Sequence, residues 1–302
     1  MTPAIEVRDL VKDYGGQRAL AGIGFRVERG EFVGLLGPNG AGKSTTLNIL
    51  AGLTRPSSGE ARVFGHDVVG EFRLARRNLG VVPQELSYES FFTVTRALRW
   101  QAGYHGLRRV DDWIEELLHR LHLWDQRDKT GRQLSGGMKR RLLVAKALVH
   151  RPPVVILDEP TAGVDVELRR ELWAFIRDLH ASGTTVLLTT HYLEEAEELC
   201  DRIAILGEGR ILALERTATL LARHTDRQYV LYLAEPEPTP PPALEPFVCR
   251  VADEGRRLVL QASGEERRAA LWDAVRSAGL AIQDVEVLRP NLEDVFLEIT
   301  HG

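Results

Sequence analysis

A glycine-rich segment at residues 37–44 has the spacing of a phosphate-binding loop. It fits GxxxxGK[ST] and consists of Gly37, Pro38, Asn39, Gly40, Ala41, Gly42, Lys43 and Ser44. Glycines let successive backbone N–H groups point at a phosphate, and a helix N-terminus adds partial positive charge. In such a loop Lys43 reaches the outer phosphates and the Ser44 hydroxyl ligates Mg²⁺. We expect this phosphate loop, with Thr45 after it, to bind a nucleotide.

Two acids close an apolar run at residues 154–159. The run Val154–Leu157 predicts a buried strand, and Asp158 and Glu159 follow it. Ligands of parallel α/β sheets bind at the carboxyl ends of strands. Asp158 is then placed to hold Mg²⁺ through water, and Glu159 to position or deprotonate an attacking water. The pair predicts hydrolysis of the bound nucleotide.

A Ser-Gly-Gly turn lies between these two motifs. The turn spans residues 134–138 and consists of Leu134, Ser135, Gly136, Gly137 and Met138. Serine is a favoured N-cap, so capping of the helix expected at 139–150 explains the turn by itself. The same N–H groups, hydroxyl and helix dipole also form an anion site. A γ-phosphate can then be held between the phosphate loop of one copy and the Ser135 turn of another. We expect the next three side chains to form a solvated helix face: Lys139, Arg140 and Arg141.

The motifs require strands and helices that place them together. Compact apolar runs of the buried parallel type lie at 32–36, 79–82, 154–157, 185–189 and 203–206. Helical patterns lie at 43–53, 166–181 and 192–200, and one long helical stretch covers 93–123. The alternation predicts an α/β fold with a mainly parallel sheet. Residues 88–150 are expected to form a helical insert in it.

The C-terminal part predicts a second, smaller domain. Its expected strands are 229–233, 247–251, 257–261 and 281–288, and its expected helices are 265–278 and 292–299. Residues 234–246 are rich in proline, which lacks an N–H and fixes φ, and predict a stiff loop or linker. We therefore divide the chain into domains 1–225 and 226–302, the latter a small α+β domain. Its apolar helix faces either pack on their own sheet or contact a second copy.

Composition excludes several classes of protein. The net charge is −4 and the isoelectric point about 6.2, which argues against binding nucleic acid or anionic lipid by charge. No apolar run reaches the roughly 20 residues that span a bilayer, and residues 1–11 predict a strand rather than a signal peptide. Cys200 and Cys249 form no CxxC pair, and the histidines show no metal-ligand spacing. We expect a cytoplasmic protein.

The three motifs occur in the order found in ABC transporter ATPases, which the chain resembles over residues 3–215. The resemblance implies an ABC fold with a parallel core sheet, an antiparallel β subdomain and a helical insert. It implies ATP and Mg²⁺ as ligands and assigns four further positions. Tyr14 matches the adenine-stacking aromatic, Gln84 the glutamine that senses Mg²⁺ and the permease, and His191 the histidine on the γ-phosphate. Asp165 matches the acid of the family's D-loop.

Two features resemble the ABC-2 exporter branch, which includes YadG-like ATPases. The Ser135 turn ends in Met138, where many members have glutamine, and residues 139–141 follow as Lys-Arg-Arg. The ending at 291–297 is the other feature. This resemblance implies an ATPase that dimerises with itself or a homologous ATPase and drives a separate integral-membrane ABC-2-type permease for export. It places the chain at the inner face of the cell membrane through that permease.

Two other classes of nucleotide-binding protein fit the sequence less well. A non-transport ABC ATPase, acting on a soluble or nucleic-acid machine, resembles two fused cassettes or a cassette split by a coiled coil. This chain has one phosphate loop, and the segment between Lys43 and Asp158 is too short for a coiled coil. A P-loop kinase or GTPase switch is disfavoured by the Ser135 turn and by Glu159.

Overall fold

The chain forms two compact units, Met1–Arg216 and Thr217–Gly302. A computed structural model describes residues 2–85, 90–223, 227–262, 264–288 and 292–301. The division falls before helix α8 (Thr217–Arg223), whereas the sequence placed it near residue 225. None of the described helices is long and apolar enough to cross a membrane.

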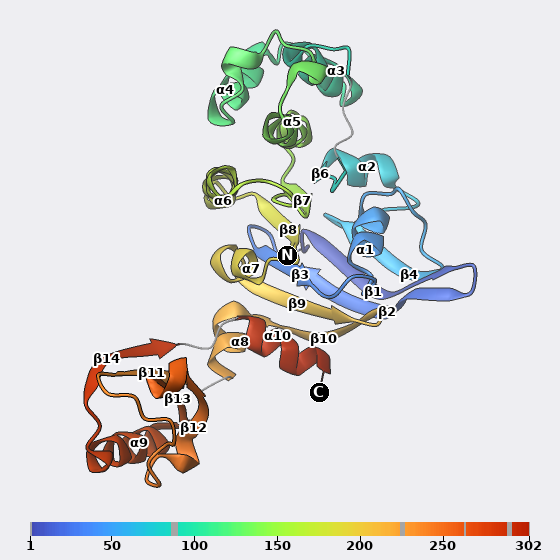
Figure 1. Cartoon of the computed structure of the whole chain (residues 1–302). Coiled ribbons are helices and arrows are strands. Elements are labelled where there is room, and N and C mark those ends of the chain that lie inside the picture. The colour runs from blue at the N-terminus through green and yellow to red at the C-terminus, as the bar shows by residue number, and fades with distance from the viewer. Residues whose placement is uncertain (1, 86–89, 224–226, 263, 289–291, 302) are drawn as a thin grey trace. The chain divides into compact units, whose positions relative to one another are not determined.

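A six-stranded sheet forms the centre of the first unit (Figure 1). Its spatial order is β10-β9-β3-β8-β7-β6, and all neighbours are parallel except β10 and β9. The strands are β3 (Phe32–Leu36), β6 (Leu79–Val82), β7 (Val154–Asp158), β8 (Thr185–Thr189), β9 (Arg202–Gly207) and β10 (Arg210–Arg216). Every residue of β3 and β8 is buried, as expected of strands covered on both faces. The predicted α/β fold is confirmed.

An antiparallel sheet from the N-terminal part of the chain shares a core with the central sheet. Its order is β2-β1-β4-β5, with β1 (Ile5–Tyr14), β2 (Gln17–Val27), β4 (Ser58–Val63) and β5 (His66–Asp67). Helix α1 (Lys43–Leu50) contacts both sheets, because it touches β2, β4 and β7. Its buried Leu47 belongs to a cluster that also holds Ile5 of β1 and Ile156 of β7. This packing fixes the position at which α1 begins.

The described part of the segment expected as a helical insert contains α3 (Val94–Tyr104), α4 (Asp111–Arg120) and α5 (Gly136–Leu148), and α2 (Phe72–Arg77) precedes it. The long helical stretch expected over 93–123 consists of two helices, because the chain turns between α3 and α4. Gly106 (φ 73°) and Arg109 (φ 57°) are left-handed there, a conformation that ends a right-handed helix. Two 3₁₀ turns, η1 (Trp124–Gln126) and η2 (Gly131–Gln133), lead to α5. Helix α5 contacts both α3 and β6, so it joins the insert to the sheet.

The second unit is built around an antiparallel sheet of order β12-β13-β11-β14. Its strands are β11 (Arg227–Leu233), β12 (Val248–Ala252), β13 (Arg257–Ala262) and β14 (Ile282–Leu288). Helices α9 (Gly264–Ala278) and α10 (Leu292–His301) and the 3₁₀ turns η3 (Glu245–Phe247) and η4 (Asp253–Gly255) complete it with α8. Leu271 and Val275 of α9 lie in one core with Leu231 and Leu260, so this helix packs on its own sheet. The proline-rich segment connects β11 to β12, and its Leu244 is buried in that core.

Helices α6 (Val166–Ala181) and α7 (Leu193–Leu199) cover one side of the central sheet and enclose a buried acid. Glu195 of α7 is fully buried. Its Oε1 accepts hydrogen bonds from Trp173 Nε1 at 2.8 Å and from Thr161 Oγ1 at 3.0 Å. Burial raises the pKa of Glu195 above the ordinary carboxyl value, and these hydrogen bonds oppose the rise.

Replacement of this acid should change how stability depends on pH. Because the folded protein holds the Glu195 proton more tightly than the unfolded chain, the contribution of Glu195 to stability declines as pH rises through the folded pKa. Glu195→Gln cannot ionise and keeps an acceptor oxygen. Its Tm should therefore rise relative to the parent protein as pH increases from about 5 to 8. Glu194→Gln, at an exposed position of the same helix, is the control. Parallel Tm curves for Glu195→Gln and the parent would contradict the assignment.

Candidate active site

Polar groups follow four neighbouring parallel strands of the central sheet. The phosphate loop follows β3, His191 follows β8, Asp158 ends β7 with Glu159 after it, and Gln84 follows β6. Since β3, β8, β7 and β6 are adjacent and parallel, their carboxyl ends meet at one edge. Residues up to about 150 positions apart in the sequence are thereby placed around one site.

The phosphate loop turns tightly around the start of α1. Lys43 is 7% exposed, and its Nζ donates to the carbonyl oxygens of Gly37 at 2.6 Å and Pro38 at 3.1 Å. Gly40 (φ 85°) and Gly42 (φ 108°) are left-handed, which glycine tolerates without strain. Burial lowers the pKa of Lys43, and the charges of Glu159 and Asp158 oppose that shift. The loop thus presents a confined cation beside backbone N–H groups.

A hollow of about 310 Å³ lies over the loop and brings most of the predicted residues together. It is lined by Tyr14, Gln17, Arg18, Ala19, Asn39, Gly40, Gly42, Lys43, Ser44, Thr45, Gln84 and Glu159. Tyr14 ends β1 with 48% of its surface exposed, and Lys12 Nζ lies 4.7 Å from its ring centroid. Residues 17–19 were not predicted from the sequence, and they reach the hollow because β2 pairs back on β1 just after Tyr14. We refer to this feature as the nucleotide hollow.

Two other predicted residues, Gln84 and His191, contact the Glu159 carboxylate. Its Oε2 accepts a hydrogen bond from Gln84 Nε2 at 3.0 Å and lies 3.2 Å from His191 Nδ1. The Glu159 side chain is 11% exposed, while that of His191 is 47% exposed. The Glu159 backbone has φ 46°, a left-handed conformation that costs about 1–3 kcal/mol outside glycine and often marks active sites. Its N–H donates to the Thr189 carbonyl oxygen at 3.0 Å, which holds that conformation.

Asp158 lies beside Glu159 and is held by a strand residue. Thr189 Oγ1 donates a hydrogen bond of 2.5 Å to Asp158 Oδ1. Burial raises the pKa of Asp158, the Thr189 hydrogen bond opposes the rise, and the Glu159 charge adds to it. Thr189 gives no functional signal in the sequence, because a threonine at a strand end is expected from β propensity alone.

The Ser135 turn caps α5 and stands apart from the nucleotide hollow of its own chain. Ser135 Oγ accepts from the Met138 N–H at 3.3 Å, as a helix N-cap does. Ser135 and Gly136 are exposed and Gly137 is half-buried, and none of the three is among the described residues that line the hollow. Asp165 has a similar local role, since its Oδ1 accepts from Leu168 N–H at 2.9 Å and caps α6.

The expectation of a solvated face at residues 139–141 is wrong for Arg140. This side chain is 3% exposed. Its Nη1 donates to the Pro83 carbonyl oxygen at 2.8 Å and its Nη2 to the Glu159 carbonyl oxygen at 3.0 Å. A run of basic residues after an N-cap does not indicate that one of them is buried. Arg140 is buried by contacts with loops that lie far away in the sequence.

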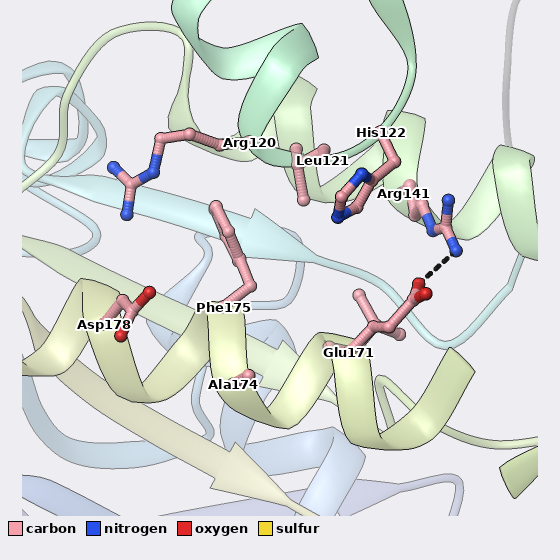
Figure 2. Close-up of a pocket in the computed structure, with 9 residues that line it drawn as sticks. Arg120, Leu121, His122, Arg141, Glu171, Ala174, Phe175 and Asp178 are labelled. Atoms are coloured by element: carbon pink, nitrogen blue, oxygen red, sulfur yellow. Dashed lines mark hydrogen bonds and ion pairs between the residues drawn. The ribbon is translucent and has the colours of Figure 1, made fainter. Parts of the chain in front are cut away.

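A second hollow, of about 330 Å³, lies between α4, α5 and α6 (Figure 2). Arg141 projects into it and forms an ion pair with Glu171 of α6. Arg120 lies over the Phe175 ring, 5.2 Å from its centroid. None of the predicted site residues lines this hollow. Among the described residues, no three or more His, Cys, Asp or Glu side chains gather as a metal site.

Residues 20–162 match the family described as ABC transporter. The chain is 42% identical to a daunorubicin resistance ATP-binding protein, DrrA3, of Streptomyces coeruleorubidus, over 98% of this chain and 96% of that protein. It is 39% identical to a Nod factor export ATP-binding protein I of Ralstonia nicotianae, over 99% of this chain and 94% of that protein. A solved ATP-binding cassette, described as a dimeric post-hydrolysis state bound to ADP and Pi, is similar in structure. Its TM-score is 0.65 at 26% identity, with 70% of this chain and 98% of that chain covered.

The glycines of the phosphate loop should differ in their tolerance of a side chain. A Cβ on Gly42 would lie 2.6 Å from Leu20 Cδ2 and 2.8 Å from the Ala19 carbonyl oxygen, whereas one on Gly40 meets nothing within 4 Å. Gly42→Ala should therefore lower the free energy of unfolding by about 1–3 kcal/mol more than Gly40→Ala, because overpacking adds to a similar backbone strain. Urea denaturation of both variants measures the difference. Equal losses would show that the contacts around Gly42 do not constrain the loop.

Proposed function

The chain belongs to the ABC transporter family as an ATP-binding subunit with ATPase activity, and we propose that two copies close on ATP to drive a separate ABC-2-type permease. The observation that carries the proposal is the Glu159 carboxylate, contacted by Gln84 and His191 beside the phosphate loop. The direction we propose is export. A relative named for Nod factor export, similar over nearly the whole chain, supports that direction.

ATP binding uses the nucleotide hollow. The backbone N–H groups of the phosphate loop and Lys43 Nζ take the phosphates, since Lys43 exchanges contacts with carbonyl oxygens for a phosphate anion. The exposed ring of Tyr14 offers a face for the adenine. Ser44 and Thr45, at the start of α1, lie where the helix N-terminus favours negative charge.

The oxygen donors near the phosphates fit Mg²⁺. Mg²⁺ prefers oxygen ligands and is commonly held by one or two carboxylates together with substrate phosphates and water. Ser44 would supply its hydroxyl, Asp158 would act through water, and Gln84 would supply Oε1, because its Nε2 already donates to Glu159. When bound, Mg²⁺ neutralises charge on the β- and γ-phosphate oxygens.

Glu159 is proposed to position and deprotonate the attacking water. Gln84 and His191 both contact Oε2, so the carboxylate is oriented while Oε1 can accept a proton. His191 would contact the γ-phosphate as a donor through Nε2, and Nδ1 can donate to Glu159 at the same time only when both ring nitrogens carry a proton. The strained backbone of Glu159, held by Thr189, keeps the carboxylate at the end of β7.

The second half of each site is proposed to come from the other copy. The Ser135 turn is exposed and lies outside its own nucleotide hollow, yet it has the hydroxyl, N–H groups and helix N-terminus of an anion site. The dimeric cassette with ADP and Pi supports this arrangement by similarity. Through the permease the chain would lie at the inner face of the cell membrane. The alternative of a non-transport ATPase has no structural observation in its favour.

The role of Glu159 has a direct test. Glu159→Gln should bind ATP but lower kcat by roughly 10²–10⁴-fold, because an amide cannot accept the proton of water. The variant should therefore accumulate as an ATP-bound dimer, which gel filtration separates from the monomer. Glu116→Gln, at an exposed position on α4, serves as the matched control and should keep normal turnover. Near-normal kcat in Glu159→Gln would remove this residue from the mechanism.

The composite site can be tested with two inactive variants. Ser135→Arg places a bulky side chain at the turn, and Lys43→Ala disables the phosphate loop, so each protein alone should lack activity. A mixture should regain part of the ATPase rate, because a heterodimer has one site in which both halves are intact. The rate is measured against mixing ratio, with each variant alone as the control. Normal turnover by Ser135→Arg alone would rule out the two-copy site.

A further inference from the structure

Arg140 is a buried cation that contacts the backbone beside two proposed site residues, Gln84 and Glu159. It belongs to α5, the helix that begins at the Ser135 turn. Its two terminal nitrogens donate to two carbonyl oxygens from different parts of the chain, Pro83 at 2.8 Å and Glu159 at 3.0 Å. The planar guanidinium holds two donors in a fixed geometry, so it fixes the distance between these two loops.

The two carbonyl groups flank the contact between Gln84 and Glu159. Pro83 directly precedes Gln84, and Gln84 Nε2 donates to Glu159 Oε2 at 3.0 Å. The backbone of Glu159 is held at both of its polar groups, since its N–H donates to the Thr189 carbonyl oxygen and its carbonyl oxygen accepts from Arg140. Arg140, the Pro83–Gln84 segment and Glu159 therefore form a closed ring of contacts.

Burying the Arg140 guanidinium costs free energy, and packing alone does not explain why the protein buries it. A guanidinium taken out of water is unfavourable unless it is paired and hydrogen-bonded. Burial lowers the pKa of Arg140, and the charges of Asp158 and Glu159 oppose that shift. The neighbouring Arg141 is used differently, because it points into the hollow of Figure 2 and pairs with Glu171 of α6. Adjacent arginines on one helix thus have separate tasks.

We propose that Arg140 is a positioning residue for hydrolysis, which holds the Glu159 backbone and the Gln84 segment in the arrangement that orients the Glu159 carboxylate. The proposal rests on the role of Glu159 proposed above. Arg140 acts through Glu159 and Gln84 and does not contact ATP. Its loss should therefore slow the chemical step and leave nucleotide binding unchanged.

The test compares Arg140→Met, Arg140→Lys and Arg141→Met. Arg140→Met should lower kcat by about 10²-fold, because a displacement near 1 Å of a catalytic group costs that much. Its Kd for ATP, measured with a fluorescent ATP analogue, should change by less than about twofold. Arg140→Lys keeps the charge but loses the planar fork that reaches both carbonyl groups, so its kcat should lie between those of the parent and Arg140→Met. Arg141→Met, the matched control on the same helix, should keep kcat within about threefold of the parent.

A double-mutant cycle separates positioning from a purely structural effect. In the Glu159→Gln background, Arg140→Met should lower the residual rate by less than about twofold, since the group it positions is already absent. Full additivity of the two losses, or a normal kcat in Arg140→Met, would overturn the proposal. If Arg140→Met does not fold, Arg140→Lys in both backgrounds decides the question by the same comparison. Near-normal turnover of Glu159→Gln would instead refute the proposed role of Glu159, whatever Arg140 does.

Discussion

The parallel pairing of β3, β8, β7 and β6 is the constraint on which the active site depends. Because the four carboxyl ends meet at one edge, groups that follow separate strands come within hydrogen-bond distance of one another, as Gln84 and Glu159 do. The same pairing buries the strands on both faces, and this explains why β3 and β8 are apolar throughout. Fold and site thus share one cause, and the ends of these strands are where the polar residues concentrate.

The sequence predicted most of this arrangement because its signals are local. Buried parallel strands are continuous apolar runs, and β3, β6 and β8 were predicted with the bounds that the structure has. The phosphate loop could be located because glycine spacing, Lys43 and the helix after it are all encoded in one short segment. Gln84 and His191 were singled out only by family resemblance, since neither residue is distinctive by itself, and their contacts with Glu159 were not predicted.

The features that were missed depend on contacts between distant segments. Arg140 and Arg141 are adjacent and identical in type, yet one is buried among backbone carbonyl groups and the other pairs with Glu171. The turn between α3 and α4 depends on left-handed residues that interrupt an otherwise helical pattern. The burial of Glu195 was missed for the same reason, because a glutamate in an acidic helix gives no sign that it will be enclosed and hydrogen-bonded by Trp173. Periodicity reports which face is apolar, but not which polar side chains the fold will enclose.

The burial of Lys43 and Asp158 would favour the binding of charged ligands beside them. Burial lowers the pKa of Lys43 and raises that of Asp158, so the charged form of each group is less stable than in water. A phosphate anion beside Lys43 and a divalent cation near Asp158 would each stabilise the charged form. The protein meets the cost of enclosing these groups during folding, through the core that packs α1 between two sheets. The charges of the proposed ligands, ATP and Mg²⁺, would then complete an electrostatic arrangement that the fold leaves only partly balanced.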